Sequence, residues 1–256
     1  GWYAGRFPKD PKIGIGKTQS LLNGNDMIIE ENGDGLHFAV ACRIIKEPAS
    51  PVIINSHRME QKTVKNKFIV LISVVTDREN KAPVEAARKL LDEAETDGIE
   101  QLKADKDNWY KNFWSNAFMK LGDDYLENIY YLRRYLMAAG SQGEFPVAFN
   151  GGLWRWNRDV MNWVTPHHWN TQQQYWGLCA QNDCQLMTPY LDTYFKMIPS
   201  GETLAKEYGA SDDALLITEA HCFTGEQTGK DREDMRNNFT PASQIASLFW
   251  DYYAFT

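Results

Sequence analysis

Residues 144–176 read EFPVAFNGGLWRWNRDVMNWVTPHHWNTQQQYW, a segment in which indole rings are interspersed with side-chain amides. Leu, Ile and Val, the usual residues of a protein core, are few here. Flat apolar rings stack on the C–H faces of sugars, and amides donate and accept hydrogen bonds without bringing charge. The segment therefore predicts a carbohydrate pocket. The alternative is that the same Trp and amide residues form a hydrogen-bonded core between helices.

We expect the sugar-contacting side chains to come from both halves of this segment. The candidates carry an aromatic ring or a polar group that can meet a hydroxyl: Asn150, Trp154, Trp156, His168, Asn170, Gln172 and Trp176. Residues 168 and 172 are one helical turn apart, so they are expected at one wall of the pocket. The spacing of His167, His168 and His221 joins no two of them with a carboxylate on one helical face. No metal and no other cofactor is predicted.

Two carboxylates near this segment are candidates for the chemistry. Glu219 lies in LLITEAHCFTG, residues 215–225, between apolar and aromatic neighbours that disfavour a charged carboxylate. A neutral carboxyl can protonate a leaving oxygen, so Glu219 is predicted to be a general acid. Its alternative is an ordinary glutamate at a helix entry or in a loop. Asp159 is the second candidate, but Arg158 beside it makes a structural ion pair an equal alternative.

The composition of the chain limits its partners. The 256 residues carry a net charge of -7 and no long run of Lys or Arg, which argues against nucleic acid and anionic membrane surfaces. No apolar run approaches the roughly 20 residues of a membrane span. A neutral oligosaccharide fits this composition better. The four cysteines, which lack zinc-type spacing, are interpreted as free or mostly buried thiols: Cys42, Cys179, Cys184 and Cys222.

The residues before the central segment predict strands and then helices. Residues 27–30, 36–45 and 67–76 are rich in Ile, Val and Phe, with Asn-Gly and Asp-Gly turns between them. The continuous apolar run at 67–72 is typical of a strand buried on both faces. A few strands alone leave open edges, so residues 1–82 are predicted to close a β-sandwich that begins earlier in a longer protein.

Helical spacing of apolar residues begins at Pro83. It predicts helices over 83–97, 99–114 and 123–140, the last with Gly140 as its C-terminal cap. Residues 83–108 are expected to form a rigid helical linker. Further helices are predicted over 170–182, 188–199, 202–208 and from Thr240 and Pro241 onward, with Thr240 as the cap. Successive helices without strand alternation favour an all-α part built of helix pairs.

Four runs in a fixed order carry a family resemblance: NWYKNFWS at 108–115, YYLRRYLMAAGS at 130–141, FNGGLW at 149–154 and HWNTQQQYW at 168–176. The chain resembles glycoside hydrolases with an N-terminal β-sandwich and a six-hairpin α/α barrel. The similarity is to the inverting α-L-fucosidases of family 95 and to a related uncharacterised bacterial group. The resemblance implies an internal fragment with three parts: a sandwich end at 1–82, a linker at 83–108 and the first part of the barrel at 109–256.

One motif departs from the fucosidase pattern. The fucosidases carry His-x-Asn-x-Asn-x-Gln-x-Asn-Tyr-Trp, whose two asparagines position the attacking water. In residues 166–176 of this chain Asn170 keeps the place of the second asparagine, and His168 stands where the first should be. The resemblance therefore implies a catalytic role for Asn170 but leaves fucose specificity and the scheme of water activation open.

These observations together predict an inverting glycoside hydrolase that acts on a neutral or plant- or host-type oligosaccharide, with Glu219 as general acid. An inverting enzyme needs a second carboxylate about 6.5–9.5 Å from the acid, and this base is expected beyond residue 256. The alternative is a non-catalytic carbohydrate-binding or scaffold protein of the same fold. By the resemblance, a periplasmic or secreted location is expected. The identity of the sugar and the oligomeric state stay open.

Overall fold

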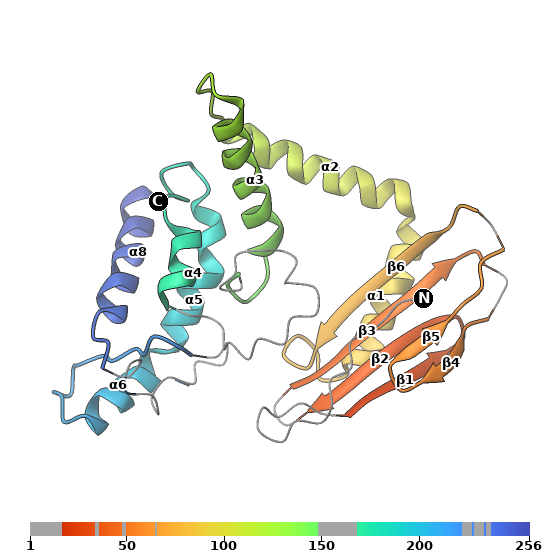
Figure 1. Cartoon of the computed structure of the whole chain (residues 1–256), viewed down its shortest axis with the longest axis horizontal. Coiled ribbons are helices and arrows are strands. Elements are labelled where there is room, and N and C mark those ends of the chain that lie inside the picture. Colours follow the sequence, from red (N-terminus) through yellow and green to blue (C-terminus); the bar gives the residue numbers. More distant parts are fainter. Residues whose placement is uncertain are drawn as a thin grey trace. The chain divides into compact units, whose positions relative to one another are not determined.

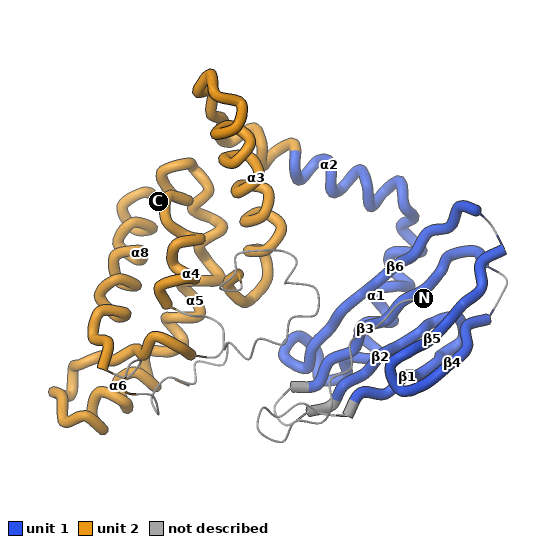
Figure 2. The backbone as a smooth tube through the Cα atoms, viewed as in Figure 1, with its two compact units in different colours: residues 1–110 blue, residues 111–256 orange. Residues whose placement is uncertain are grey.

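A computed structural model of the chain describes residues 17–33, 36–47, 50–64, 66–147, 168–221, 227, 233 and 237–256. It divides into two compact units, residues 1–110 and 111–256, which are coloured separately in Figure 2. The first, called the sheet unit, holds the strands and helix α1. The second, called the helical unit, holds the helices from α3 onward. Helix α2, Ile99–Ser115, begins in the sheet unit and ends in the helical unit.

The sheet unit is built on four antiparallel strands in the order β1-β2-β3-β6 (Figure 1). Their bounds are β1 Lys17–Asn23, β2 Asp26–Gly33, β3 Leu36–Ile45 and β6 Ile69–Thr76. Asn23 pairs with Asp26, so two residues make the first turn, and Gly24 there has a φ of 60°, as such tight hairpins require. A separate hairpin pairs β4, Val52–Asn55, with β5, Arg58–Glu60.

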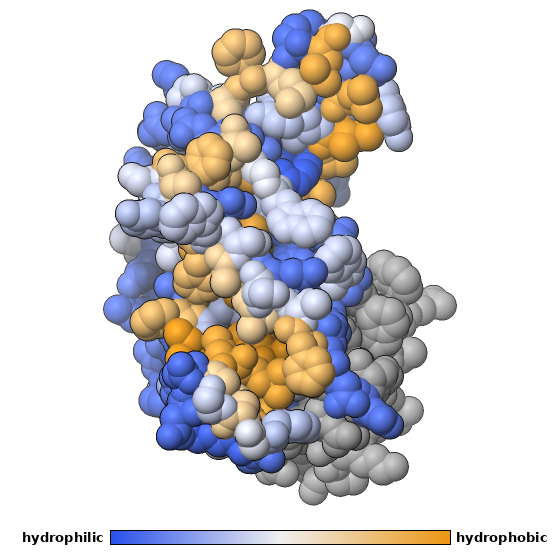
Figure 3. Space-filling model, turned by 90° about the vertical axis from the view of Figure 1, so that its left-hand side faces the viewer, coloured by the Kyte–Doolittle hydropathy of each residue, from blue (hydrophilic) through white to orange (hydrophobic). Residues whose placement is uncertain are grey.

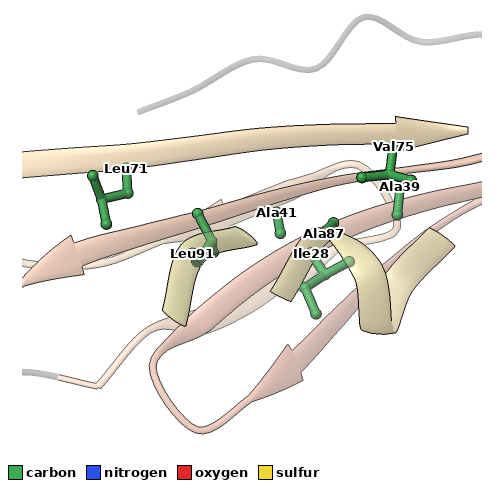
Figure 4. Close-up of a cluster of buried hydrophobic side chains, with 7 residues drawn as sticks. All are labelled: Ile28, Ala39, Ala41, Leu71, Val75, Ala87 and Leu91. Atoms are coloured by element: carbon green, nitrogen blue, oxygen red, sulfur yellow. The ribbon is translucent and has the colours of Figure 1, made fainter. Parts of the chain in front are cut away.

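Helix α1, Pro83–Asp97, covers one face of this sheet (Figure 4). Ala39 and Ala41 are fully buried, and their small side chains let the helix approach the strands closely. Ser73 also donates a hydrogen bond to the carbonyl of Ala87 at 2.7 Å. The buried cluster consists of Ile28, Ala39, Ala41, Leu71, Val75, Ala87 and Leu91. Helix α1 therefore contributes to the core of the sheet unit. The predicted division into a sandwich end at 1–82, a linker at 83–108 and a barrel part at 109–256 stays a prediction.

The predicted strands are confirmed as β2, β3 and β6, but β6 is not buried on both faces. Leu71, Ser73 and Val75 face α1, while Ile72 and Val74 are 49% and 57% exposed on the other face. The prediction of two-sided burial was wrong because an apolar run does not reveal which face is covered. Strands β1, β4 and β5 were missed, since β1 (KTQSLLN) is largely polar and the others are short.

After α2, the described residues of the helical unit form five α-helices and one short 3-10 helix, η1. Their bounds are α3 Asp124–Gly140, α4 His168–Tyr175, η1 Cys184–Met187, α5 Thr188–Lys196, α6 Ile198–Glu207 and α8 Pro241–Phe255. The predicted helices at 83–97, 99–114 and 123–140 are confirmed. No described helix is long and apolar enough to cross a membrane.

Several predicted helix ends were wrong for local reasons. Helix α4 was predicted to reach residue 182 but ends at Tyr175. Two residues later Gly177 adopts a φ of 77°, which a helix cannot contain. Pro199 lies in the first turn of α6 instead of closing α5. Gly140 is the last residue of α3, and Ser141 takes the cap position. By contrast, Thr240 occupies the N-cap position of α8 as predicted, although its side chain makes no capping hydrogen bond.

Two adjacent arginines of α3 hold the residues that follow α4. Arg134 donates from Nε and Nη2 to the carboxylate of Asp183, both at 2.8 Å, and both side chains are fully buried. Arg133 donates to the carbonyls of Gln174 and Trp176 at the end of α4. A cation at this end satisfies carbonyls that the helix leaves free and complements its dipole.

A disulfide joins Cys179 and Cys184, which lie on either side of the turn that carries Asp183. The interpretation of these two cysteines as free thiols was wrong. The four residues between them do not predict the turn that brings the Cα atoms of Cys179 and Cys184 within 4.3 Å of each other. Cys42 is free and half-buried, as predicted. Cys222 lies outside the described residues.

Candidate functional site

The segment that follows α6 returns to the N-terminal end of α4 and places Glu219 there. The amide N–H of His168 donates to the backbone carbonyl of Glu219 at 2.8 Å, and that of Trp169 donates to Oε1 at 3.1 Å. Nδ1 of His168 lies 2.7 Å from Oε2 of the same carboxylate. One residue thus satisfies two of the N–H groups that the start of a helix leaves free.

The same carboxylate also reaches the residues before α8. Asn238 donates from Nδ2 to Oε2 of Glu219 at 3.0 Å, and its own Oδ1 accepts a bond of 2.7 Å from the hydroxyl of Thr240. A second bond links the two helices directly, because Gln172 donates to Oε1 of Gln244 at 3.2 Å. Glu219 and the two glutamines therefore tie the N-terminal half of α4 to that of α8.

The two faces of α4 differ in burial. His168, Thr171, Gln172 and Tyr175 recur at three-to-four spacing on the buried face. Trp169 and Asn170 lie on the other face and are exposed. Trp169 packs edge-on against the ring of Trp176, with ring centroids 5.6 Å apart. His168 and Gln172 thus share one face of the helix, while Asn170 and Trp176 lie away from it.

Three polar atoms on the buried face lack a hydrogen-bond partner within the part of the chain that the structure describes. They are Nε2 of His168, Oγ1 of Thr171 and Oε1 of Gln172. The three residues are 1%, 0% and 0% exposed. Buried polar atoms are nearly always paired with protein or with water, because an unpaired one costs free energy. The hydrogen-bonding capacity of these three atoms is therefore not used by any residue that the structure describes.

A row of buried aromatic rings in tilted and edge-to-face contact lies behind this face. The ring centroids of Tyr175 and Tyr190 are 4.6 Å apart, those of Tyr190 and Tyr194 are 4.7 Å apart, and those of Tyr194 and His221 are 5.0 Å apart. Burial raises the pKa of Tyr175 to about 12, although its hydrogen bonds with the hydroxyl of Ser141 and the backbone N–H of Val147 partly offset this rise. The pKa of Tyr194 is raised well above its ordinary value, first by burial and then by nearby groups that include Glu219. The phenols stay neutral at ordinary pH and form a rigid support for the face.

The structure does not bear on the predicted residues in the centre of the Trp/amide segment. Asn150, Trp154, Trp156, Asp159 and His167 lie outside the described residues, so their convergence on one pocket stays a prediction. Within the ranges that are described, no group of three or more His, Cys, Asp or Glu side chains could hold a metal ion.

Sequence reasoning missed two residues that complete the arrangement, Asn238 and Gln244. Both lie near the start of α8, about 70 residues after α4, and nothing local in the sequence marks them. The contact between Tyr190 and Tyr194 could have been predicted, because these residues are four positions apart in a predicted helix.

Comparison with known proteins identifies the family. Among solved structures, the chain is similar to a putative kojibiose phosphorylase from the human microbiome, with a TM-score of 0.65, 12% sequence identity and 93% of this chain covered. The match takes up 33% of that protein, so the chain spans about a third of its length, and at this identity the likeness shows the fold alone. No curated protein matches the chain. Residues 76–256 match the model of the glycosyl hydrolase family 95 catalytic domain, which is well over half of the chain, and the chain therefore belongs to this family.

Proposed function

We propose that this chain forms part of an enzyme that cleaves glycosidic bonds, and that the N-terminal end of α4 with Glu219 belongs to its sugar site. The observation that carries the proposal is the row of buried polar atoms on α4, directly beside a carboxylate, that have no hydrogen-bond partner among the described residues. Neutral amides, a hydroxyl and an imidazole suit a neutral oligosaccharide, because they match hydroxyl groups without needing a counter-charge. Membership of the family supports the same reading.

The proposal places the helical unit in a six-hairpin α/α barrel and the sheet unit in a β-sandwich. Apolar side chains that the described chain leaves uncovered support this placement. Figure 3 shows such side chains among polar ones on one side of the molecule. Phe118, Tyr125, Phe239 and Tyr253 are each more than 70% exposed. Exposed apolar surface on this scale is typical of faces that pack against further structure.

The proposal that Glu219 is the general acid requires that one particular oxygen of its carboxyl group carries the proton. Its side chain is 19% exposed, which suits a group at the edge of a pocket. Oε2 already accepts from Asn238 and faces Nδ1 of His168, so a proton placed on Oε2 would displace one of these contacts. The acid would therefore have to carry its proton on Oε1, beside the bond from Trp169.

Leaving-group dependence tests this role in the intact protein. The wild type is first assayed on a panel of 4-nitrophenyl glycosides, glycosyl fluorides and natural oligosaccharides. A general acid contributes about 10²- to 10⁴-fold, so in that role Glu219→Gln would slow cleavage of oligosaccharides by such a factor and spare glycosyl fluorides, whereas a carboxylate that only holds other groups would affect both substrates. The exposed Glu202→Gln on α6 is the matched control and should change neither rate. Equal losses on both kinds of substrate would exclude the acid role.

The fate of the sugar separates hydrolysis from phosphorolysis. Both reactions break the glycosidic bond, but one transfers the glycosyl group to water and the other to phosphate. Assays with and without inorganic phosphate, with detection of free sugar and of sugar 1-phosphate, decide between them. Saturable sugar binding without any turnover would favour the alternative, a carbohydrate-binding protein of the same fold.

A periplasmic or secreted location is part of the proposal. The bond between Cys179 and Cys184 supports it, because disulfides persist in oxidising compartments and are rare where thiols are kept reduced. Fractionation of the producing cells, with the chain detected by antibody, tests the location directly. Recovery of the chain in the cytosol with both thiols reduced would contradict it.

A further inference from the structure

The geometry points to a role for Glu219 other than proton donor. We propose that Glu219 positions the ring of His168, so that Nε2 of His168 accepts a hydrogen bond from a hydroxyl group, of a neutral sugar or of a water molecule, at the buried face of α4. The inference rests on the proposed function for the identity of the ligand, but the orientation of the ring does not depend on it.

The first step is the state of the imidazole. Nδ1 of His168 lies 2.7 Å from Oε2 of Glu219, and an ionised carboxylate only accepts hydrogen bonds. The hydrogen of a neutral imidazole therefore sits on Nδ1, and Nε2 presents its lone pair. This is the arrangement in which a carboxylate fixes both the tautomer and the orientation of a histidine.

The second step is the rigidity of the carboxylate. Asn238 holds Oε2 from the side of α8, while the amide N–H of Trp169 holds Oε1 from α4. The backbone of Glu219 is fixed as well, because its carbonyl accepts from the amide of His168. Glu219 cannot turn without breaking contacts to two helices. The ring that it holds therefore keeps one direction.

The third step concerns which ligand matches the polar atoms beside the ring of His168 on the buried face of α4. Nε2 of His168 is buried and has no hydrogen-bond partner among the described residues, and the same holds for Oγ1 of Thr171 and Oε1 of Gln172. Residues 168, 171 and 172 lie on one side of the helix. Two of these atoms are acceptors and the third is a hydroxyl, so the matching ligand is one that donates O–H groups. A phosphate or carboxylate needs donors and does not fit.

A spectroscopic test reads the imidazole directly. The chain has five histidines, so a sample labelled with ¹⁵N in histidine gives few side-chain signals, and His168→Gln assigns those of His168 by their loss. The wild type should show a hydrogen on Nδ1 and none on Nε2 at neutral pH. Glu219→Ala should yield a mixture of both tautomers, whereas Glu202→Ala should change nothing. A wild-type hydrogen on Nε2, or a tautomer indifferent to Glu219→Ala, would overturn the proposal.

Folding of the variants does not limit this test. If Glu219→Ala fails to fold by circular dichroism, the wild-type tautomer alone still decides whether Nε2 is free to accept. Glu219→Gln keeps the shape and an acceptor oxygen, so it should preserve more of the Nδ1–H tautomer than Glu219→Ala in a sample that remains folded. The reverse order would contradict a positioning role.

The ligand is tested by addition of probes to the labelled intact protein. A neutral sugar released by the enzyme, or a non-cleaved thio-oligosaccharide, should move the Nε2 signal of His168, and inorganic phosphate at the same concentration should not. If the sugar leaves the signal unmoved, a nuclear Overhauser effect between a bound water and the carbon-bound ring hydrogens of His168 shows whether water occupies the site. A response to phosphate with none to sugar or water would overturn the proposed ligand class.

Kinetics distinguish the positioning role from the acid role and from failure of the proposed function. A positioning residue affects every substrate alike, so Glu219→Ala should lower kcat/KM by about 10²-fold for oligosaccharides and for glycosyl fluorides together, and Glu219→Gln, which keeps an acceptor oxygen, should lower both by less. A loss confined to oligosaccharides would identify the acid and overturn the positioning role. If the wild type cleaves no glycoside, the proposed function fails, while the tautomer of His168 still decides the inference about its ring.

Discussion

Arg134 and Asp183 form an ion pair with two hydrogen bonds of 2.8 Å each, and neither side chain is exposed to solvent. The hydrogen bonds to Asp183 raise the pKa of Arg134 above its ordinary value, against the effect of burial. The guanidinium also lies 4.5 Å from the ring centre of Phe113, so α2 and α3 meet at this pair. Asp183 follows α4 in the chain, and the pair therefore connects the two earlier helices to the end of the helix that carries the candidate site.

Removal of one partner of this pair should be strongly destabilising. Asp183→Asn leaves a buried guanidinium without its counter-charge, and breaking a buried pair typically costs about 3–5 kcal/mol. Urea denaturation followed by far-ultraviolet circular dichroism measures the loss. Glu144→Gln is the control, because its partner Lys196 and Glu144 itself are 61% and 48% exposed and such pairs contribute about 1 kcal/mol or less. Equal effects of the two substitutions would contradict the structural role of the buried pair.

The disulfide should stabilise the same region. It closes a short loop, for which restriction of the unfolded chain is worth about 2 kcal/mol. The double variant Cys179→Ser and Cys184→Ser should therefore lower the Tm, and dithiothreitol should lower the Tm of the wild type by a similar amount. Cys42→Ser should respond to dithiothreitol as the wild type does, because Cys42 is not bonded. An unchanged Tm under reducing conditions would contradict a stabilising bond.

Acid should weaken the sheet unit through Asp26. Burial favours the neutral form of this carboxyl, but hydrogen bonds from Arg43 and Arg88 outweigh burial and hold its pKa below the ordinary value of 3.8. The unfolded chain thus binds a proton at a higher pH than the folded chain does. The stabilisation is complete above the ordinary pKa and is lost as pH falls through the lowered one. The unfolding free energy should therefore decrease below about pH 4.

Asp26→Asn gives the measurement that isolates this carboxyl. The variant should be less stable than the wild type at neutral pH, and its stability should depend less on pH between about 5 and 2. Urea midpoints across this range supply both quantities. Asp97→Asn at the exposed end of α1 is the control and should keep the slope of the wild type. A variant slope identical to that of the wild type would show that other carboxylates cause the acid sensitivity.

The sequence was informative where a signal is local. The helices over 83–97, 99–115 and 124–140 follow from apolar spacing and end signals within one segment, and the three strands with branched apolar residues follow from composition. The covered face of β6, the disulfide and the pair of Arg134 with Asp183 depend on chain segments that meet only in the folded protein. Residue spacing in the sequence does not predict these three features.

In the candidate site, too, some features follow from local sequence and others only from contacts in the folded chain. His168 and Gln172 share a helical face because they are four residues apart, which the sequence predicts. Glu219 was chosen for its apolar neighbours, yet its contacts come from residues 50 positions earlier and 19 positions later. An expectation built on neighbours in sequence favours a proton donor, whereas the contacts in space favour a carboxylate that holds other groups. That difference is what the tests on Glu219 measure.

The exposed pair of Trp169 and Trp176 should contribute to sugar binding. The rings are 43% and 45% exposed and stand at 89° to each other, so a free indole face remains for the C–H groups of a sugar. Loss of one such contact is worth about 1 kcal/mol, so Trp176→Ala should weaken binding of a neutral oligosaccharide roughly fivefold. Calorimetric titration of the intact protein measures the affinity.

Trp250→Ala provides the matched comparison for this test. Trp250 is 67% exposed on α8 and packs against Tyr253, so the substitution also removes an exposed indole from an aromatic pair. Sugar affinity should be unchanged by Trp250→Ala and reduced by Trp176→Ala. Intrinsic fluorescence should respond to sugar in the Trp250 variant as in the wild type, and less in the Trp176 variant. If both variants bind sugar like the wild type, the exposed face of α4 is not part of the site, and the sugar contacts must be sought on its buried face and among residues 148–167.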